Sequence, residues 1–256
     1  MTREIEALFR REAYPLEVHA GRDIGAGHLR GWGLEYGDLY EGRVVGDPLF
    51  AEAFRAARAR GSLLALHKLA NLYLVIRYAM AEDAGDIYEF GSFMGGSAVF
   101  MGVILRGLRR RARVLAFDTY EGMPATDAVR DMHSRGDFSE TGHSGLLHYI
   151  EANGLSDHVQ TVKGEFSASL PGVLAKGGKV GLVHVDCDIY EPIKYVVRAC
   201  LPHLAPAAHV VFDDPLHGSC LGAFDAVQEL MIRELQLTAE QAYPHLVFRC
   251  PSLVAA

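Results

Sequence analysis

The 256-residue chain lacks the features that mark several large classes of protein. Its four cysteines form no CxxC pair and show no zinc-type spacing, so we expect reduced thiols and no disulfide framework. A net charge of -7 disfavours nucleic acid as a partner. The most apolar stretch, residues 63–80, is interrupted by polar side chains and predicts a buried helix, with no membrane span. Because the charged N-terminus shows no secretory signal, we expect a soluble cytoplasmic protein.

A clear strand pattern is missing from residues 1–60, which are rich in glycine. We predict an irregular N-terminal arm or lid here, ending in a helix from Pro48 to about Arg60. Asp47 is suited to cap that helix, and proline is favoured at the first helical position. The domain proper is predicted to occupy residues 61–256. The arm and the apolar helix after it would suit a homodimer.

From residue 86 onward, short apolar strands alternate with helices. The predicted strands lie at residues 86–90, 114–118, 158–163, 180–186, 209–213 and 245–250. This alternation predicts an α/β protein with a mostly parallel, doubly wound sheet. A long polar connection, residues 119–144, follows the second strand, and connections of this length are usually functional or mobile.

Two of the predicted strands end in carboxylates. Asp186 and Asp188 follow one strand, and Asp213 and Asp214 follow the next. Ligands of open α/β sheets bind at the carboxyl ends of the strands. Four negative charges gathered there are unstable without a cation, so a metal site is the first hypothesis. The alternative is that one or two of these side chains only cap the following helices.

A glycine loop joins the first strand to its helix, with the sequence EFGSFMGGS over residues 89–97. Phe93 stands where the middle glycine of a GxGxxG motif belongs, and the lysine of a P-loop is missing. A smaller nucleoside is therefore favoured over a dinucleotide or a triphosphate. Glu-x-Gly-x-x-x-Gly-x-Ser is typical of S-adenosylmethionine-dependent methyltransferases, although a plain βα turn would also explain it. Asp118, at the end of the second strand, suits the ribose hydroxyls.

Several strings in the chain resemble the macrocin O-methyltransferase family. They are FDTYEGMP at residues 117–124, GDFS at 136–139, VDCDIYE at 185–191 and FDD at 212–214. Members of this family methylate sugar hydroxyls on antibiotics with S-adenosylmethionine and magnesium, and a related branch methylates mannose oligosaccharides. The resemblance covers residues 60–235 and implies a seven-stranded class I methyltransferase sheet. Cys187 departs from the family's usual glycine, and His217 lies on a stretch that varies.

The resemblance also implies roles for individual residues. Asp186, Asp213 and Asp214 match the metal-binding carboxylates, and Asp188 matches the second aspartate of the paired motif. The residues expected to bind S-adenosylmethionine are Glu89, Gly91, Ser92, Gly95, Ser97, Asp118, Tyr120 and Glu165.

The predicted reaction is methyl transfer to a sugar hydroxyl of a glycoside or oligosaccharide. Such a hydroxyl needs alignment and a base, and Mg²⁺ is the expected ion because all candidate ligands are hard oxygens. The base is Asp186, Asp188 or His143, with a carboxylate favoured because it is fixed on the sheet. Two alternatives are a catechol-type Mg²⁺-dependent O-methyltransferase and a cofactor-binding module without turnover.

The remaining histidines have weaker claims to a function. His67 and His184 are predicted to pack in the core. His133 is interpreted as a solvated loop residue that contacts substrate only if the connection closes. His217 is a candidate to support the metal site by contacting one of the residues that bind the ion.

Overall fold

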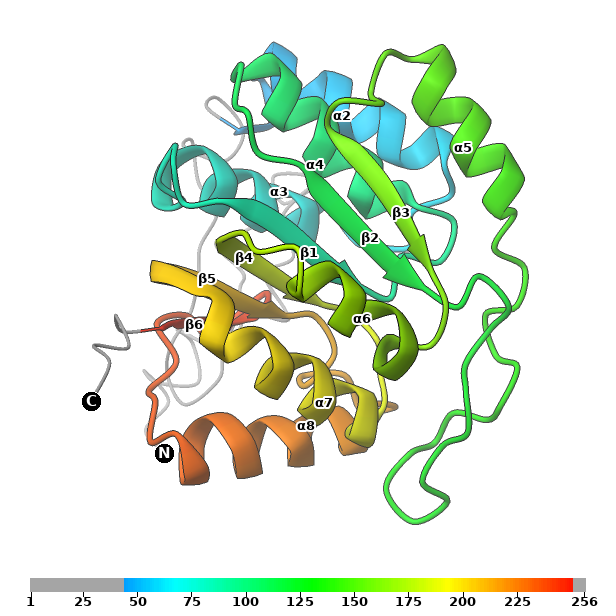
Figure 1. The fold of residues 1–256 in the computed structure, drawn as a ribbon, viewed down its shortest axis with the longest axis vertical. Helices are drawn as coiled ribbons and strands as arrows, with labels where there is room; N and C mark the ends of the chain where they lie inside the picture. The colour runs from blue at the N-terminus through cyan, green and yellow to red at the C-terminus, as the bar shows by residue number, and fades with distance from the viewer. Residues whose placement is uncertain (1–43, 251–256) are drawn as a thin grey trace, which may run out of the picture.

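Six strands form one sheet within residues 44–250, the part of the chain that the computed structural model describes. The strands are β1 (Asp86–Phe90), β2 (Val114–Asp118), β3 (Val159–Lys163), β4 (Val180–Val185), β5 (Leu204–Phe212) and β6 (Leu246–Arg249). Their order is β3-β2-β1-β4-β5-β6, and every neighbouring pair is parallel except β5 and β6 (Figure 1). The predicted doubly wound α/β fold is confirmed.

The described residues form six strands, and the expected seventh strand is not found among them. The chain between β6 and the preceding π-helix η5 (Gln228–Glu234) folds back onto β6 and makes no strand of its own. Its ladder contact is an isolated bridge between Gln241 and Val247. A second difference is the start of β5, which begins at Leu204, five positions before the predicted His209.

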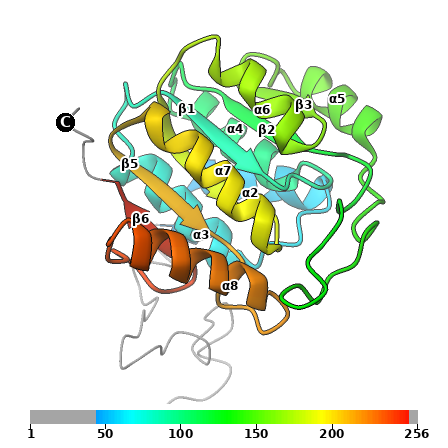
Figure 2. The same cartoon turned by 60° about the horizontal axis from the view of Figure 1, so that its bottom comes forward.

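Helices cover both faces of the sheet, because alternate side chains of each strand point to opposite faces. Ile87 packs into the core on one face and Tyr88 into the core on the other. The first face carries α2 (Pro48–Ala59), α3 (Leu66–Leu74), α4 (Gly96–Gly107) and α5 (His143–Ala152). The second carries α6 (Phe166–Leu174), α7 (Tyr190–Cys200) and α8 (Leu221–Val227). Figures 1 and 2 show the two layers of helices on either side of the strands.

The predicted helix after Asp47 is confirmed as α2. The Asp47 carboxylate accepts a hydrogen bond from the Leu49 backbone N–H at 2.8 Å, which is an N-cap. Phe50 of this helix is buried against the edges of Tyr73 and Phe100. Residues 1–43 lie outside the described residues, so the arm and its boundary stay predictions. Among residues 44–250, no helix is long and apolar enough to cross a membrane.

The apolar segment 62–80 is helical from Leu66 onward. Helix α3 continues directly into a π-helical turn, η3 (Val75–Ala79), and Met80 ends it in an extended conformation. The helix is buried, as predicted, but it also carries Lys68 and Asn71 into the interior. Two polar side chains inside an apolar helix require partners, and both find them at the sheet edge.

Candidate active site

A cavity of about 640 Å³ opens at the carboxyl ends of β1, β2, β4 and β5. Its wall combines the glycine loop, the connection after β2 and the carboxylates that follow β4 and β5. Four of the predicted cofactor residues line it: Gly91, Ser92, Ser97 and Asp118. All four predicted strand-end carboxylates line it as well. The two motifs singled out in the sequence therefore share one cavity.

The glycine loop packs closely against the end of β4. Gly91 has a φ of 91°, and a Cβ built on it would lie 1.7 Å from the carbonyl oxygen of Asp186. No side chain fits there, which explains glycine at this position. Gly95, at φ 81°, is the N-cap of α4, and a Cβ there would meet Leu146. Gly91 thus brings the loop to the carboxylates after β4, and Gly95 lets it pack against α5.

Glu89 lies behind the cavity wall and does not line it. Its side chain is fully buried, accepts a 2.5 Å hydrogen bond from the Ser92 hydroxyl and lies 3.2 Å from Nδ1 of His184. His184 is a core residue, as predicted. Glu89 thus anchors the glycine loop through Ser92 from beneath.

Asp118 ends β2 and holds two loops together. One carboxylate oxygen accepts the Phe93 N–H at 2.8 Å, and the other accepts the Tyr120 N–H at 2.6 Å. Burial raises the pKa of this carboxyl above its usual value, against the lowering effect of these hydrogen bonds. The carboxylate still lines the cavity beside the glycine loop.

Asp186, Asp213 and Asp214 converge as the sequence predicts. Each offers a carboxylate oxygen within 4.8 Å of those of the other two. The sheet fixes two of them, because the Asp186 N–H donates to the Phe90 carbonyl and the Asp213 N–H donates to the Val185 carbonyl. Burial and the charges of the neighbouring carboxylates raise the pKa of Asp186 and of Asp214 well above the usual value.

Lys68 is the site residue that sequence reasoning missed. Its ammonium lies 2.5 Å from a carboxylate oxygen of Asp213, donates to the Asp213 carbonyl and lies 3.1 Å from His217 Nε2. The other Asp213 oxygen lies 2.9 Å from Nε2 of His245, whose Nδ1 is bonded to Asn71. The sequence does contain an indication of this role: a lysine and an asparagine lie three positions apart on an apolar helix, which places both side chains on one face.

Asp213 consequently differs from its two neighbours. Burial disfavours its ionised form, but the hydrogen bond from His245 and the charge of Lys68 outweigh that effect and hold its pKa well below the usual range. One carboxylate of the three is thus stabilised as an anion by the protein itself. For the other two, the charge of Lys68 and the Asp188 N–H bond to Asp214 do not outweigh burial and the neighbouring carboxylates. A divalent cation between the three oxygens therefore fits both the donor chemistry and the charge.

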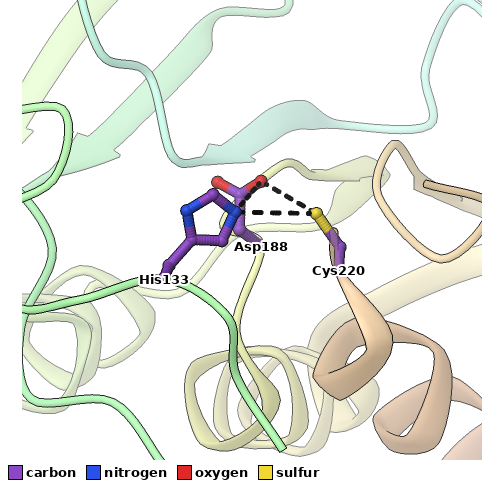
Figure 3. A group of neighbouring side chains, drawn as sticks. All are labelled: His133, Asp188 and Cys220. Atoms are coloured by element: carbon purple, nitrogen blue, oxygen red, sulfur yellow. Dashed lines mark hydrogen bonds and ion pairs between the residues drawn. The ribbon is translucent and has the colours of Figure 1, made fainter. Parts of the chain in front are cut away.

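Asp188 stands apart from this cluster and faces a histidine and a thiol (Figure 3). Its backbone is left-handed, with φ 60°, and its N–H donates to a carboxylate oxygen of Asp214 at 2.8 Å. Its Oδ1 accepts from Cys220 Sγ at 3.4 Å and lies 3.8 Å from His133 Nε2. His133 was interpreted as a solvated loop residue, but the structure places it on the cavity wall.

Several predicted residues lie away from the carboxylates. His143, at the start of α5, stacks on Tyr120 at 4.2 Å between ring centroids, and its Nε2 is bonded to the Thr161 hydroxyl. Neither ring lines the cavity, and the exposed side chain of Glu165 does not line it either. The structure therefore does not bring His143 together with Asp186 and Asp188.

Comparison with known proteins gives the family. The methyltransferase domain family matches residues 88–215, which is 128 of the 256 residues. A Streptomyces olivaceus enzyme is 30% identical over 196 residues, covering 72% of this chain and 74% of its own. It is the 4'-O-methyltransferase of 8-demethyl-8-(2,3-dimethoxy-α-L-rhamnosyl)-tetracenomycin C. The mycinamicin III 3''-O-methyltransferase of Micromonospora griseorubida is 24% identical, covering 62% of this chain and 66% of its own.

Solved structures of methyltransferases share the fold. The O-methyltransferase NovP superposes with a TM-score of 0.61 at 21% identity, covering 72% of this chain and 79% of its own. The calicheamicin methyltransferase CalS11 superposes with a TM-score of 0.56 at 20% identity, covering 79% and 93%. The resemblance stated from the sequence motifs is confirmed: the chain belongs to the methyltransferase domain family and is an S-adenosylmethionine-dependent O-methyltransferase.

Proposed function

We propose that this enzyme methylates a sugar hydroxyl of a glycoside or oligosaccharide, with S-adenosylmethionine as methyl donor and Mg²⁺ as a required ion. The observation that carries the proposal is the cluster of Asp186, Asp213 and Asp214, whose oxygens lie within 4.8 Å of one another. The cluster lines the same cavity as the glycine loop. A site for binding the cofactor alone has no need of three converging carboxylates.

Gly91, Ser92, Ser97 and Asp118 are the residues we propose for contact with S-adenosylmethionine, because they line the cavity. Glu89 supports them from behind through its hydrogen bond with Ser92. When bound, S-adenosylmethionine supplies a methyl group on a positively charged sulfur. Gly95, Tyr120 and Glu165 lie outside the cavity wall, so we propose that they shape the loops around it.

Asp186, Asp213 and Asp214 are the residues we propose to hold Mg²⁺, since hard oxygens are its preferred ligands. When bound, the ion would orient sugar hydroxyls and lower the pKa of the one that is methylated. Lys68 and His245 keep the Asp213 carboxylate ionised and fixed in direction before any ion arrives.

Asp188 is the residue we propose to accept the proton of the sugar hydroxyl. Its side chain is 21% exposed toward the cavity, and its backbone N–H is held by Asp214. That contact fixes the carboxylate beside the metal-binding cluster, where an acceptor hydroxyl would lie. Asp186 is occupied as a ligand in this arrangement, and His143 is turned toward Thr161. Asp188 is therefore preferred over both.

The sugar acceptor is supported by the two relatives, whose names place their methyl groups on sugars of tetracenomycin and mycinamicin glycosides. The cavity wall also offers two aromatic rings, Phe93 and Phe138, packed edge to face at 5.7 Å. Rings of this kind suit the apolar C–H face of a deoxysugar.

A panel of acceptors tests the proposal. The purified enzyme, S-adenosylmethionine and Mg²⁺ are incubated in parallel with a rhamnosylated polyketide, its aglycone, a mannose oligosaccharide and a catechol, and products are identified by mass. We expect methylation of a glycoside or oligosaccharide and none of the aglycone. Methylation of the catechol alone would overturn the sugar acceptor, and tight cofactor binding with no product from any acceptor would favour a module without turnover.

A further inference from the structure

Three side chains of types that can bind metals, an imidazole, a carboxylate and a thiol, meet on the cavity wall (Figure 3). They are His133 from the connection after β2, Asp188 from the turn after β4 and Cys220 from the residue before α8. Cys220 Sγ lies 3.4 Å from Asp188 Oδ1 and 3.8 Å from His133 Nε2. The distance between Asp188 Oδ1 and His133 Nε2 is also 3.8 Å. The three atoms form a nearly equilateral triangle.

These separations match those between ligands of one tetrahedral ion. Zinc binds sulfur at about 2.3 Å and nitrogen or oxygen at about 2.0–2.2 Å, so tetrahedral angles put its ligand atoms roughly 3.3–3.6 Å apart. The observed triangle of 3.4, 3.8 and 3.8 Å needs only a small contraction to reach that size.

Neighbouring carboxylates orient two of these side chains, His133 and Asp188. His133 Nδ1 lies 3.5 Å from a carboxylate oxygen of Asp137, which leaves Nε2 free to face Asp188. That Asp137 oxygen also accepts the Ser134 N–H at 2.9 Å. A carboxylate behind a histidine is the usual partner of a metal-binding imidazole. Asp188 in turn is held by Asp214 and adopts a left-handed backbone, a conformation that persists only when its surroundings impose it.

We propose that His133, Asp188 and Cys220 form a second metal site, which takes a thiophilic divalent ion such as zinc and is distinct from the all-oxygen cluster of Asp186, Asp213 and Asp214. Three protein ligands leave the fourth position for a water from the cavity. On binding, the thiol of Cys220 forms a bond to the metal and releases its proton to solvent, with no change of oxidation state.

Ligand type separates the two sites. Mg²⁺ prefers oxygen ligands, whereas a thiolate with an imidazole selects zinc or cobalt. Cys187 also lines the cavity, but its thiol belongs to no three-residue cluster of suitable donors among the described residues. It therefore serves as a matched control for Cys220.

Occupation of this site has a consequence for activity. The ion takes the carboxylate of Asp188 and ties the connection, through His133, to the turn before α8. A methyl acceptor then loses its base, so the ion inhibits. This consequence rests on the proposed function, whereas the binding itself does not.

Cobalt serves as the probe, because a thiolate bound to Co²⁺ gives a charge-transfer band in the near ultraviolet. The metal-free, reduced full-length protein is titrated with Co²⁺ in excess Mg²⁺, which keeps the oxygen cluster filled, and then with Zn²⁺. We expect a thiolate band that saturates at one Co²⁺ per chain and is removed by Zn²⁺. Cys220→Ser abolishes the band, while Cys187→Ser retains it.

A second pair of variants tests the site without changing a buried residue. Asp137→Asn weakens Co²⁺ binding about tenfold or more if it orients His133. Glu140→Gln, on the same exposed segment, leaves the affinity unchanged. The proposal is overturned if the wild-type protein shows no thiolate band, if Cys187→Ser removes the band, or if Asp137→Asn and Glu140→Gln bind Co²⁺ equally. None of these measurements uses a methyl acceptor, so failure of the proposed function leaves them interpretable.

Discussion

The two walls of the cavity are built in different ways. At the sheet edge, backbone bonds of the ladder place Asp186 and Asp213 at the ends of β4 and β5. On the other wall, residues 119–142 form no helix or strand. They are held by local turn bonds, such as those that join Met123 to Gly136 and Asp137, and by side-chain bonds such as that from the Thr141 hydroxyl to the Tyr120 carbonyl. The sheet edge cannot shift without breaking the ladder, whereas the connection is not part of the ladder and can move without breaking it. The difference suggests that the fixed wall holds charge for chemistry and the adaptable wall receives the acceptor.

The largest expected effect is the loss of stability in Gly91→Ala, which is compared with Gly136→Ala on the other wall. Gly91→Ala would force a Cβ into the Asp186 carbonyl, so we expect a loss of more than about 4 kcal/mol in the free energy of unfolding. Gly136, in the connection, has a φ of 90° but nothing within 4 Å of its Cβ position. Gly136→Ala should cost only the left-handed backbone, about 1–2 kcal/mol. Urea unfolding of the two variants measures the contrast, and equal losses would contradict it.

The next effect concerns Asp188, the base we propose. Asp188→Asn keeps a residue that tolerates the left-handed backbone but removes the proton acceptor, so we expect kcat to fall by roughly 10²–10⁴ with little change in stability. His143→Gln is the matched control and should leave kcat near the wild-type value, because His143 does not line the cavity. Steady-state kinetics on the accepted glycoside decide it. A larger loss in His143→Gln would transfer the role to the histidine.

A substitution of Lys68 tests how much the buried ion pair with Asp213 contributes to the stability of the fixed wall. Lys68→Met leaves the Asp213 carboxylate buried without its cation, and breaking a buried pair costs about 3–5 kcal/mol. We expect a loss in that range in EDTA, measured by urea unfolding. The double variant Lys68→Met/Asp213→Asn removes both charges and should recover part of it. If the single variant is as stable as wild type, the pair does not organise this wall.

The smallest effect is expected in the connection. Thr141→Val removes a buried hydroxyl whose bond to Tyr120 is worth about 1 kcal/mol. Its result should be local: limited proteolysis within residues 119–142 becomes faster, while unfolding of the sheet changes little. Cleavage at the same rate as in wild type would show that this bond does not secure the connection.

The sequence predicted the fixed wall better than the adaptable one. Strand ends and the glycine loop follow from local patterns, so Asp186, Asp213 and Asp214 were expected together and are found together. The pairing of Lys68 with Asp213 joins residues 145 positions apart, and no local pattern specifies it. His133 was misplaced because a connection without periodicity gives no direction to its side chains. The homodimer, the arm and the cytoplasmic location stay predictions.

Metal-dependent methyl transfer by the wild-type enzyme tests the central claim most directly. Transfer of a labelled methyl group from S-adenosylmethionine to the accepted glycoside is measured after EDTA treatment and again after Mg²⁺ is restored. The carboxylate cluster predicts that transfer stops with EDTA, resumes with Mg²⁺, and does not resume in Asp186→Asn. Transfer that continues undiminished in EDTA would contradict the role of Asp186, Asp213 and Asp214 as the metal site.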